Sequence, residues 1–287
     1  MLATTGAMIS FQAGAAVAKG LFPTIGPEGA AALRLGLGAI LLLVIVRPWR
    51  DWPSKPPLLP LLALGVSTAL AILMFYRAIT LLPLGVAIPL QFLGPLTVAI
   101  IGSRRPSDLI WAGLAALGVW CLVGLGAART PINLAGVPWA LGAAVGWGVY
   151  IHFGQAATTT FGRSTGALAL SVAALVAVPL GIWHAGGALA NPRVWPTGLL
   201  IGVLSAALPF SLELFAMARM PARTFAVFTS LEPAFAVMSG FLLLHEQLAP
   251  GQLAGVAVVM TAAAGAAWSS SRADPGAHAI VADAPPN

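Results

Sequence analysis

The chain alternates between long apolar stretches and short polar or proline-containing segments. A helix needs about 20 mostly apolar residues to cross the hydrocarbon core of a bilayer, and these stretches have about that length. They predict ten membrane-spanning helices at 4–22, 28–46, 58–77, 83–102, 108–127, 134–153, 165–183, 196–218, 222–244 and 250–270. The first is the least apolar, because it contains Gln12 and ends at Lys19. The pattern therefore predicts an all-α, polytopic membrane protein.

A pattern of two prolines and a glycine occurs twice along this series, with the same spacing each time. The first copy is Pro83, Pro95 and Gly102, and the second, 138 positions later, is Pro221, Pro233 and Gly240. Repeated, proline-interrupted membrane helices are typical of secondary transporters, in which the broken helices meet near the bilayer midplane. The repeat predicts two halves, 1–128 and 133–270, followed by a disordered cytoplasmic tail at 271–287. Since five spans is an odd number, the second half is predicted to be inverted relative to the first.

Composition supports a bilayer environment and excludes several classes of function. The chain is 59% hydrophobic and 8% charged, whereas a soluble domain carries about 25% charged residues. Its net charge of +6 does not indicate nucleic-acid binding, because the Lys and Arg residues are scattered and form no basic face. A single cysteine, Cys121, excludes an internal disulfide and a thiolate metal cluster. We therefore expect no metal and no cofactor.

The basic residues are divided unevenly between the two sets of predicted loops. The loops and tail on the side of the termini hold nine Lys and Arg residues, and the opposite loops hold four. Short cytoplasmic loops of membrane proteins carry an excess of Lys and Arg. Both termini are therefore predicted to be cytoplasmic.

Carboxylates inside the spans are candidates for a transport site, because a charged residue at a helix centre costs about 2.5–3.5 kcal/mol on insertion scales. Glu232 lies beside Pro233, which cannot donate to the carbonyl of Thr229 and so favours an opened helix there. This carboxylate is the first candidate for binding a proton or an ammonium group, the alternative being a structural hydrogen bond between helices. Glu213 is a second candidate for proton coupling, the alternative being an ion pair at the interface.

Amides and aromatic side chains extend this set of candidates. Gln91 lies four residues before Pro95, and its amide can donate and accept at once, as a zwitterionic substrate requires. Its alternative role is a hydrogen bond between spans. Gln12 is a weaker candidate of the same kind. Trp147 and Tyr150 lie deep in the sixth span and are predicted to line a cavity.

Two cations near span ends are expected to have structural roles. Arg34 is expected to pair with Glu28, six residues earlier, at the outer interface, and the alternative is an anionic group inside the bundle. Lys19 is expected to extend its ammonium to the interface.

Motifs for other chemistries are absent from the sequence. It contains no Walker A, GxSxG, HExxH or CxxC motif, and the histidines form no ligand set on a shared face. The HxxxxD string of His278 and Asp283 lies in the polar tail and is interpreted as chance. No convergent catalytic set and no channel filter is visible, so the sequence predicts a transporter and not an enzyme.

Three segments carry a resemblance to a known family: AKGLFPTIGPEGAAALRLGLG (18–38), GPLTVAIIGSRRPSDLIWAGLAALGVW (94–120) and LPFSLELFAMARMPARTFAVFTSLEPAFAVMSG (208–240). Over about residues 10–268 the chain resembles two EamA domains of the drug/metabolite transporter superfamily, in particular the threonine/homoserine exporters. The run LLLHEQLAPGQLAGVAVV resembles the end-of-domain signature, in which Glu246 is typical. The resemblance implies export of small amino acids from the bacterial inner membrane, driven by protons and achieved by alternating access.

The chain departs from the family pattern at two places. The family begins with a longer cytoplasmic stretch than MLATT, so the native start is expected upstream. Gly94 stands where Glu232 stands in the second copy, so the predicted site is asymmetric. Alternatives are export of another metabolite or drug by the same fold and, from another class, a membrane-embedded lipid enzyme. The sequence is compatible with a homodimer but does not determine the oligomeric state.

Overall fold

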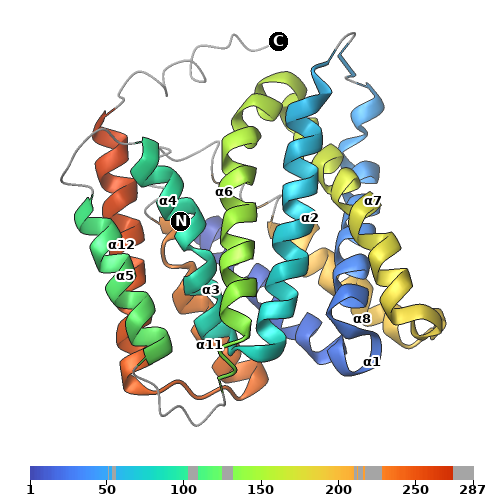
Figure 1. The fold of residues 1–287 in the computed structure, drawn as a ribbon. Coiled ribbons are helices and arrows are strands. Elements are labelled where there is room, and N and C mark those ends of the chain that lie inside the picture. Colours follow the sequence, from blue (N-terminus) through green and yellow to red (C-terminus); the bar gives the residue numbers. More distant parts are fainter. Residues whose placement is uncertain are drawn as a thin grey trace.

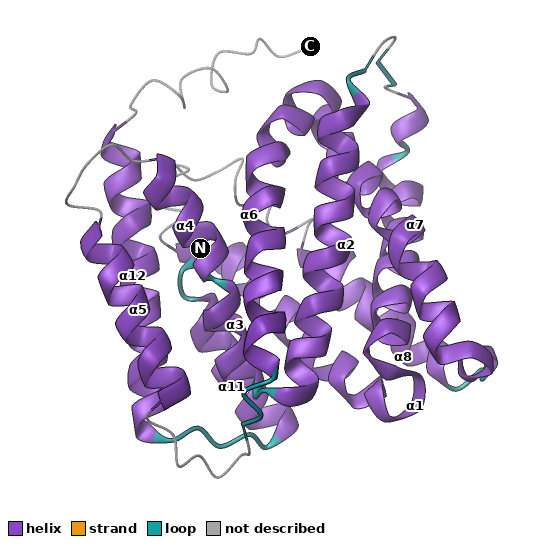
Figure 2. Cartoon of the chain, in the orientation of Figure 1, coloured by secondary structure: helices purple, strands orange, loops and turns teal. Residues whose placement is uncertain are grey.

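The computed structural model describes residues 1–50, 52–53, 56–102, 109–124, 132–209, 212, 216 and 228–273, which form helices and no strand. The longer helices are α1 (Leu2–Val46), α2 (Leu58–Leu81), α6 (Gly136–Phe161), α7 (Thr165–Ala185) and α12 (Pro250–Ala273) (Figures 1 and 2). The shorter ones are α3 (Leu84–Gln91), α4 (Leu93–Gly102), α5 (Leu109–Gly124), α8 (Val194–Gly202) and α11 (Glu232–Leu244). The prediction of an all-α protein is confirmed.

Four described stretches are long and apolar enough to cross a membrane: Leu2–Val46, Leu58–Leu81, Gly136–Ala190 and Pro250–Ser269. Large apolar side chains also cover much of the outer surface, and Leu175 and Trp183 are 76% and 86% exposed. Such a surface suits lipid and not water.

Helix α1 changes direction at Gly26, between the predicted intervals 4–22 and 28–46. Gly26 has a φ of 69° and a ψ of 170° inside an otherwise helical run, a conformation open to glycine because it lacks a Cβ atom. In Figure 1 the ribbon of α1 bends near the lower end of the bundle. Helix α1 therefore supplies two limbs to the bundle, joined by one glycine.

Pro95 and Pro233 each lie in the first turn of a helix that follows a break. Helix α3 ends at Gln91, Phe92 forms a turn and α4 begins at Leu93, so Pro95 lies at its third position. Helix α11 begins at Glu232 and carries Pro233 in its first turn. A proline fits there, because the first N–H groups of a helix have no helical acceptor.

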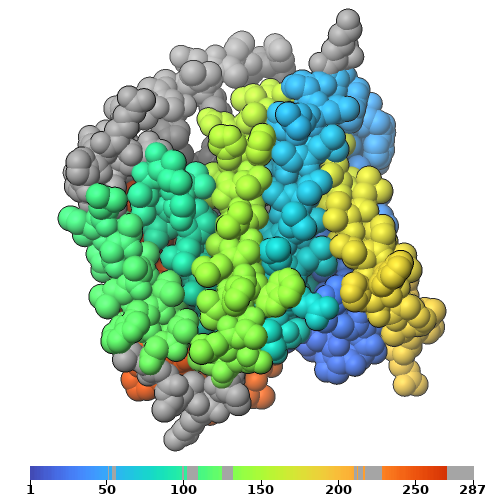
Figure 3. Space-filling view, viewed as in Figure 1, coloured from blue at the N-terminus to red at the C-terminus, as the bar shows by residue number. Residues whose placement is uncertain are grey.

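The most extensive contacts join helices of the first half of the chain to helices of the second half. Helix α2 packs on α6 and α7, α1 packs on α7 and α8, and α5 packs on α12. Figure 3 shows α6, α2 and α7 side by side on one face. A Cβ atom at Gly65 would lie 2.4 Å from the Cβ of Val172. Small residues thus bring the helices together at close range, as expected of helices packed in lipid.

Gly94 lies where α4 meets the backbone of α6. A Cβ atom at this position would lie 2.1 Å from the carbonyl oxygen of Ala144. No side chain fits there, which explains why the first copy of the repeat has no counterpart of Glu232. The asymmetry predicted from the sequence thus has a steric cause.

We expect Gly94→Ala to lower the free energy of unfolding by about 1–3 kcal/mol, because α4 and α6 must separate to admit the methyl group. Thermal unfolding in detergent measures the loss. The control is Gly113→Ala on α5, where an added Cβ atom meets nothing within 4 Å. Equal melting temperatures for the two variants would contradict the close approach of α4 to α6.

Candidate functional site

A cavity of about 650 Å³ lies inside the helix bundle. Its described walls come from α1, α2, α3, α4, α6, α7, α11, α12 and the π-helical turn η5 (Val203–Ala207). They are mostly apolar, with polar side chains at a few positions. The volume falls within the range of about 300–1,000 Å³ that is usual for small-molecule sites.

The cavity extends toward one end of the bundle. Its lining includes Gly162, Arg163 and Thr165, at the turn between α6 and α7, which is at the top of Figure 1. The described lining residues include none from the lower end, where α3 begins and α11 ends. The space is thus displaced toward the α6–α7 turn.

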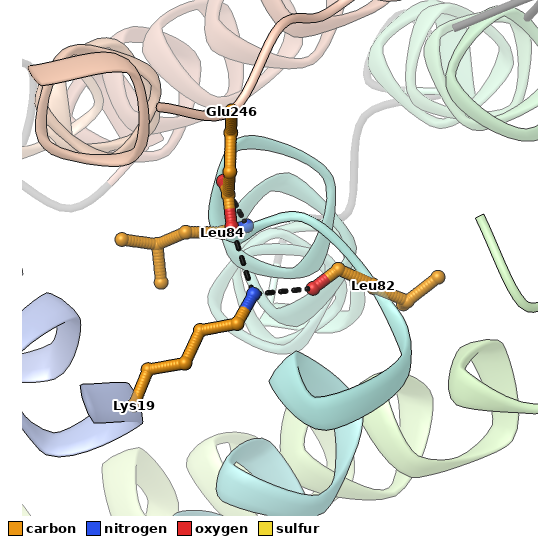
Figure 4. Close-up of polar contacts among 4 residues, drawn as sticks. All are labelled: Lys19, Leu82, Leu84 and Glu246. Atoms are coloured by element: carbon orange, nitrogen blue, oxygen red, sulfur yellow. Dashed lines mark hydrogen bonds and ion pairs between the residues drawn. The ribbon is translucent and has the colours of Figure 1, made fainter. Parts of the chain in front are cut away.

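At the lower end of the bundle, a charged cluster joins α1, the start of α3 and Glu246 (Figure 4). Glu246 accepts hydrogen bonds from Lys19 Nζ at 2.8 Å and from the backbone N–H of Leu84 at 2.7 Å. Lys19 Nζ also donates to the carbonyl oxygen of Leu82 at 3.3 Å. Because Pro83 provides no capping side chain, Glu246 caps α3 from 162 residues away. Lys19, whose ammonium was expected to extend to the interface, is 25% exposed and pairs inside this cluster.

A second ion pair lies between α1 and α2. Arg77 pairs with Glu28, just after the break in α1. The expected pairing of Arg34 with Glu28 is therefore wrong. Residues six apart on a helix point about 120° away from each other, because each residue turns by about 100°, so they do not share a face. Arg34 instead lines the cavity and donates from Nη1 to Tyr76 Oη.

Glu232 lines the cavity at the start of α11, where the partial positive charge of the helix end favours a carboxylate. Gln12 Nε2 donates to Glu232 Oε1 at 2.9 Å. Gln12 is fully buried and is not among the described lining residues, so it contacts the cavity through Glu232. Glu213, the other carboxylate expected from the sequence, lies outside the described residues.

Gln91, Trp147 and Tyr150, which the sequence proposed as site residues, all line the cavity. The Trp147 and Tyr150 rings form an edge-to-face pair with centroids 5.0 Å apart. Gln91 Oε1 and Trp147 Nε1 are buried and have no hydrogen-bond partner among the described residues. Buried polar atoms without partners are costly, so this acceptor and this donor are suited to a bound ligand.

Two residues that line the cavity, Ser205 and Arg34, were not among the site residues predicted from the sequence. Ser205 lies in the π-helical turn η5, and its Oγ is buried without a partner among the described residues. Ser10 Oγ donates to the carbonyl oxygen of Leu204 in the same turn at 2.7 Å. Such turns are frequent at functional sites, but they leave no clear signal in a sequence. For Arg34 a signal existed, because an arginine inside an apolar span is costly.

The arrangement suits a small polar molecule that has both charges and some apolar surface. A cation and a carboxylate, Arg34 and Glu232, share one cavity with an aromatic pair and three polar atoms that have no partner among the described residues. No group of three or more His, Cys, Asp or Glu side chains that could hold a metal ion occurs in the described part of the chain. The side chains that line the cavity are suited to recognising such a molecule.

The chain is similar in sequence to several known transporters. Threonine/homoserine exporter RhtA of Escherichia coli K12 is 45% identical over 259 residues, covering 90% of this chain and 88% of the relative. The exporter of the same name from Salmonella typhimurium LT2 is 44% identical over 93% of this chain and 90% of its own length. An uncharacterized transporter of Bacillus subtilis, YwfM, is 27% identical over 84% of this chain and 86% of its own.

The fold and the family are supported by two further matches. A solved crystal structure aligns with a TM-score of 0.58 at 19% identity, over 96% of this chain and 98% of the other, and shows the fold alone. The sequence profile of the EamA-like transporter family matches residues 1–124 and 134–268. The three named relatives are transporters and not enzymes. The chain therefore belongs to the EamA-like transporter family.

Proposed function

We propose that this protein exports small amino acids of the threonine/homoserine type, driven by the proton gradient across the bacterial inner membrane. The observation that carries the proposal is the 45% identity to a threonine/homoserine exporter over nearly the whole of both chains. The cavity supports it, because its volume and its mixture of charged, amide and aromatic side chains suit a small zwitterion.

The proposed architecture is ten spans in two inverted repeats of five. Helix packing supports it, because α2 packs on α6 and α7 much as α8 and η5 pack on α1. Helix α3 also packs on α11, and α5 packs on α12, which pairs the predicted fourth span with the ninth and the fifth with the tenth. A two-fold relation between the halves requires this exchange of partners.

In the proposed alternating-access cycle, this conformation faces the cytoplasm. The cavity extends toward the α6–α7 turn, which carries Arg163 and belongs to the side that is richer in Lys and Arg. The cluster of Lys19, Leu84 and Glu246 closes the opposite, outer end. Opening to the outside requires this cluster to separate. Glu232 then carries the coupling proton, with Glu213 as a second carboxylate.

Transport into inverted vesicles tests the proposal. Radiolabelled threonine and homoserine are supplied outside inverted membrane vesicles with an imposed pH gradient, acid inside. We expect accumulation that depends on the protein and collapses when an uncoupler is added. Accumulation that survives the uncoupler would contradict proton coupling, and no accumulation by correctly inserted protein would contradict the cargo.

A further inference from the structure

Arg34 is a buried cation in the wall of the cavity. Its side chain is 2% exposed, and it lies on the second limb of α1, eight residues after the break at Gly26. Eight residues of helix correspond to about 12 Å, which places the backbone of Arg34 well inside the bundle. Burial of an arginine at such a depth is costly unless an anion or several acceptors compensate its charge.

The described protein groups compensate the buried charge of Arg34 only in part. Arg34 Nη1 donates to Tyr76 Oη at 3.2 Å. The guanidinium carbon lies 4.6 Å from the centroid of the Phe11 ring and 5.5 Å from that of Tyr76. These rings hold the guanidinium and lower the cost of its burial. An arginine has five N–H donors, and the described residues accept from Arg34 at one place only.

No carboxylate among the described residues pairs with Arg34. Glu28 pairs with Arg77, and Glu246 pairs with Lys19. Glu232 accepts from Gln12, on the first limb of α1. Arg34 thus lines the cavity, most of its donors have no acceptor among the described residues, and its charge is uncompensated by these carboxylates.

We infer that Arg34 binds the carboxylate of the transported molecule, so that the cargo must carry a free α-carboxylate. This inference rests on the proposed function, because it specifies which part of an amino acid the cavity recognises. The planar guanidinium can donate two parallel N–H bonds to one carboxylate, which gives direction as well as charge. Tyr76 and Phe11 position the guanidinium.

The rest of the cavity complements this contact. The carboxylate of Glu232 lies on another wall, and the acceptor Gln91 Oε1, on a side chain 8% exposed, has no partner in the described part of the chain. These oxygens can accept from an ammonium or a hydroxyl group, whereas Arg34 can only donate. An amino acid held between them is bound at both charged groups, and an amine without a carboxylate loses one of the two.

Competition in the unaltered protein tests the inference without any risk of misfolding. Inverted vesicles are loaded with radiolabelled threonine in the presence of unlabelled threonine, threoninol or threonine methyl ester. Threoninol and the ester keep the amine and the side chain but lack the carboxylate. We expect both to compete at least about 100-fold more weakly than threonine, as the loss of two charge-assisted hydrogen bonds implies. Equal competition by threoninol would overturn the inference.

Substitutions at Arg34 assign the effect to this residue. We expect Arg34→Gln to raise the KM for threonine by about 100-fold and Arg34→Lys by about 10-fold, because lysine keeps the charge but not the paired donors. The control is Arg193→Gln, an exposed arginine outside the cavity lining, which should leave the KM unchanged. Melting temperatures in detergent identify any variant that has unfolded.

The outcomes separate this inference from the proposed function. If the unaltered protein carries threonine and a folded Arg34→Gln variant keeps the same KM, Arg34 does not bind the carboxylate and amino-acid export stands. If the variant has lost its fold, the competition by threoninol decides the matter alone. If the unaltered protein carries neither threonine nor homoserine, the proposed function fails, and the inference fails with it.

Discussion

Replacing Glu232 with glutamine is expected to reduce pH-driven accumulation of threonine in inverted vesicles to the background level. Glutamine has nearly the same shape as glutamate, and its side-chain oxygen can still accept from Gln12 Nε2, which now donates to Glu232 Oε1 at 2.9 Å. The fold should therefore survive. The amide of glutamine, however, cannot gain and lose a proton during each transport cycle.

Counterflow distinguishes lost coupling from lost binding in this variant. With threonine on both sides and no pH gradient, Glu232→Gln should still exchange labelled for unlabelled substrate. Glu28→Gln is the matched control, because Glu28 lies outside the cavity lining and pairs with Arg77. Full pH-driven accumulation by Glu232→Gln would remove Glu232 from the coupling mechanism.

Elements that depend on local chemistry could be predicted from the sequence. Apolar runs of membrane-spanning length became helices because a backbone in lipid has to satisfy its own hydrogen bonds. The prolines at 95 and 233 marked divided spans, since a proline is tolerated only where its missing N–H does no harm. Gln91, Trp147 and Tyr150 were identified because polar groups inside spans tend to face a cavity.

Elements that depend on long-range contacts could not be predicted in this way. Lys19 and Glu246 are 227 residues apart, and no spacing rule connects them. The partner of Glu28 comes from α2, and the break at Gly26 sets which limb of α1 faces it. The expected pair of Glu28 and Arg34 rested on nearness in sequence, which on a helix favours partners three or four residues apart and not six.

Removing the carboxylate of Glu246 is expected to cause the largest loss of stability among the variants considered. Glu246→Ala leaves the Leu84 N–H at the start of α3 without its acceptor and Lys19 without its counter-charge. The Glu246 side chain is 6% exposed, so little water can replace it, whereas that of Lys19 is 25% exposed and partly recovers solvent. We expect the free energy of unfolding to fall by about 2–4 kcal/mol. Thermal unfolding in detergent measures it.

Two further variants separate the cap from the ion pair. Glu246→Gln keeps an oxygen for the Leu84 N–H but removes the charge, so it should lose less stability than Glu246→Ala. Glu28→Ala breaks the other ion pair but should cost about 1 kcal/mol or less, because Arg77 is 43% exposed and remains solvated. If Glu246→Gln and Glu246→Ala melt at the same temperature, capping of α3 adds no measurable stability. The ion pair with Lys19 is then the contact that stabilises the lower end of the bundle. If Glu246→Gln melts like the unaltered protein, the cap is the stabilising contact. The charge of Glu246 would then add no measurable stability, and the lower end could lose its ion pair during transport without risk to the fold.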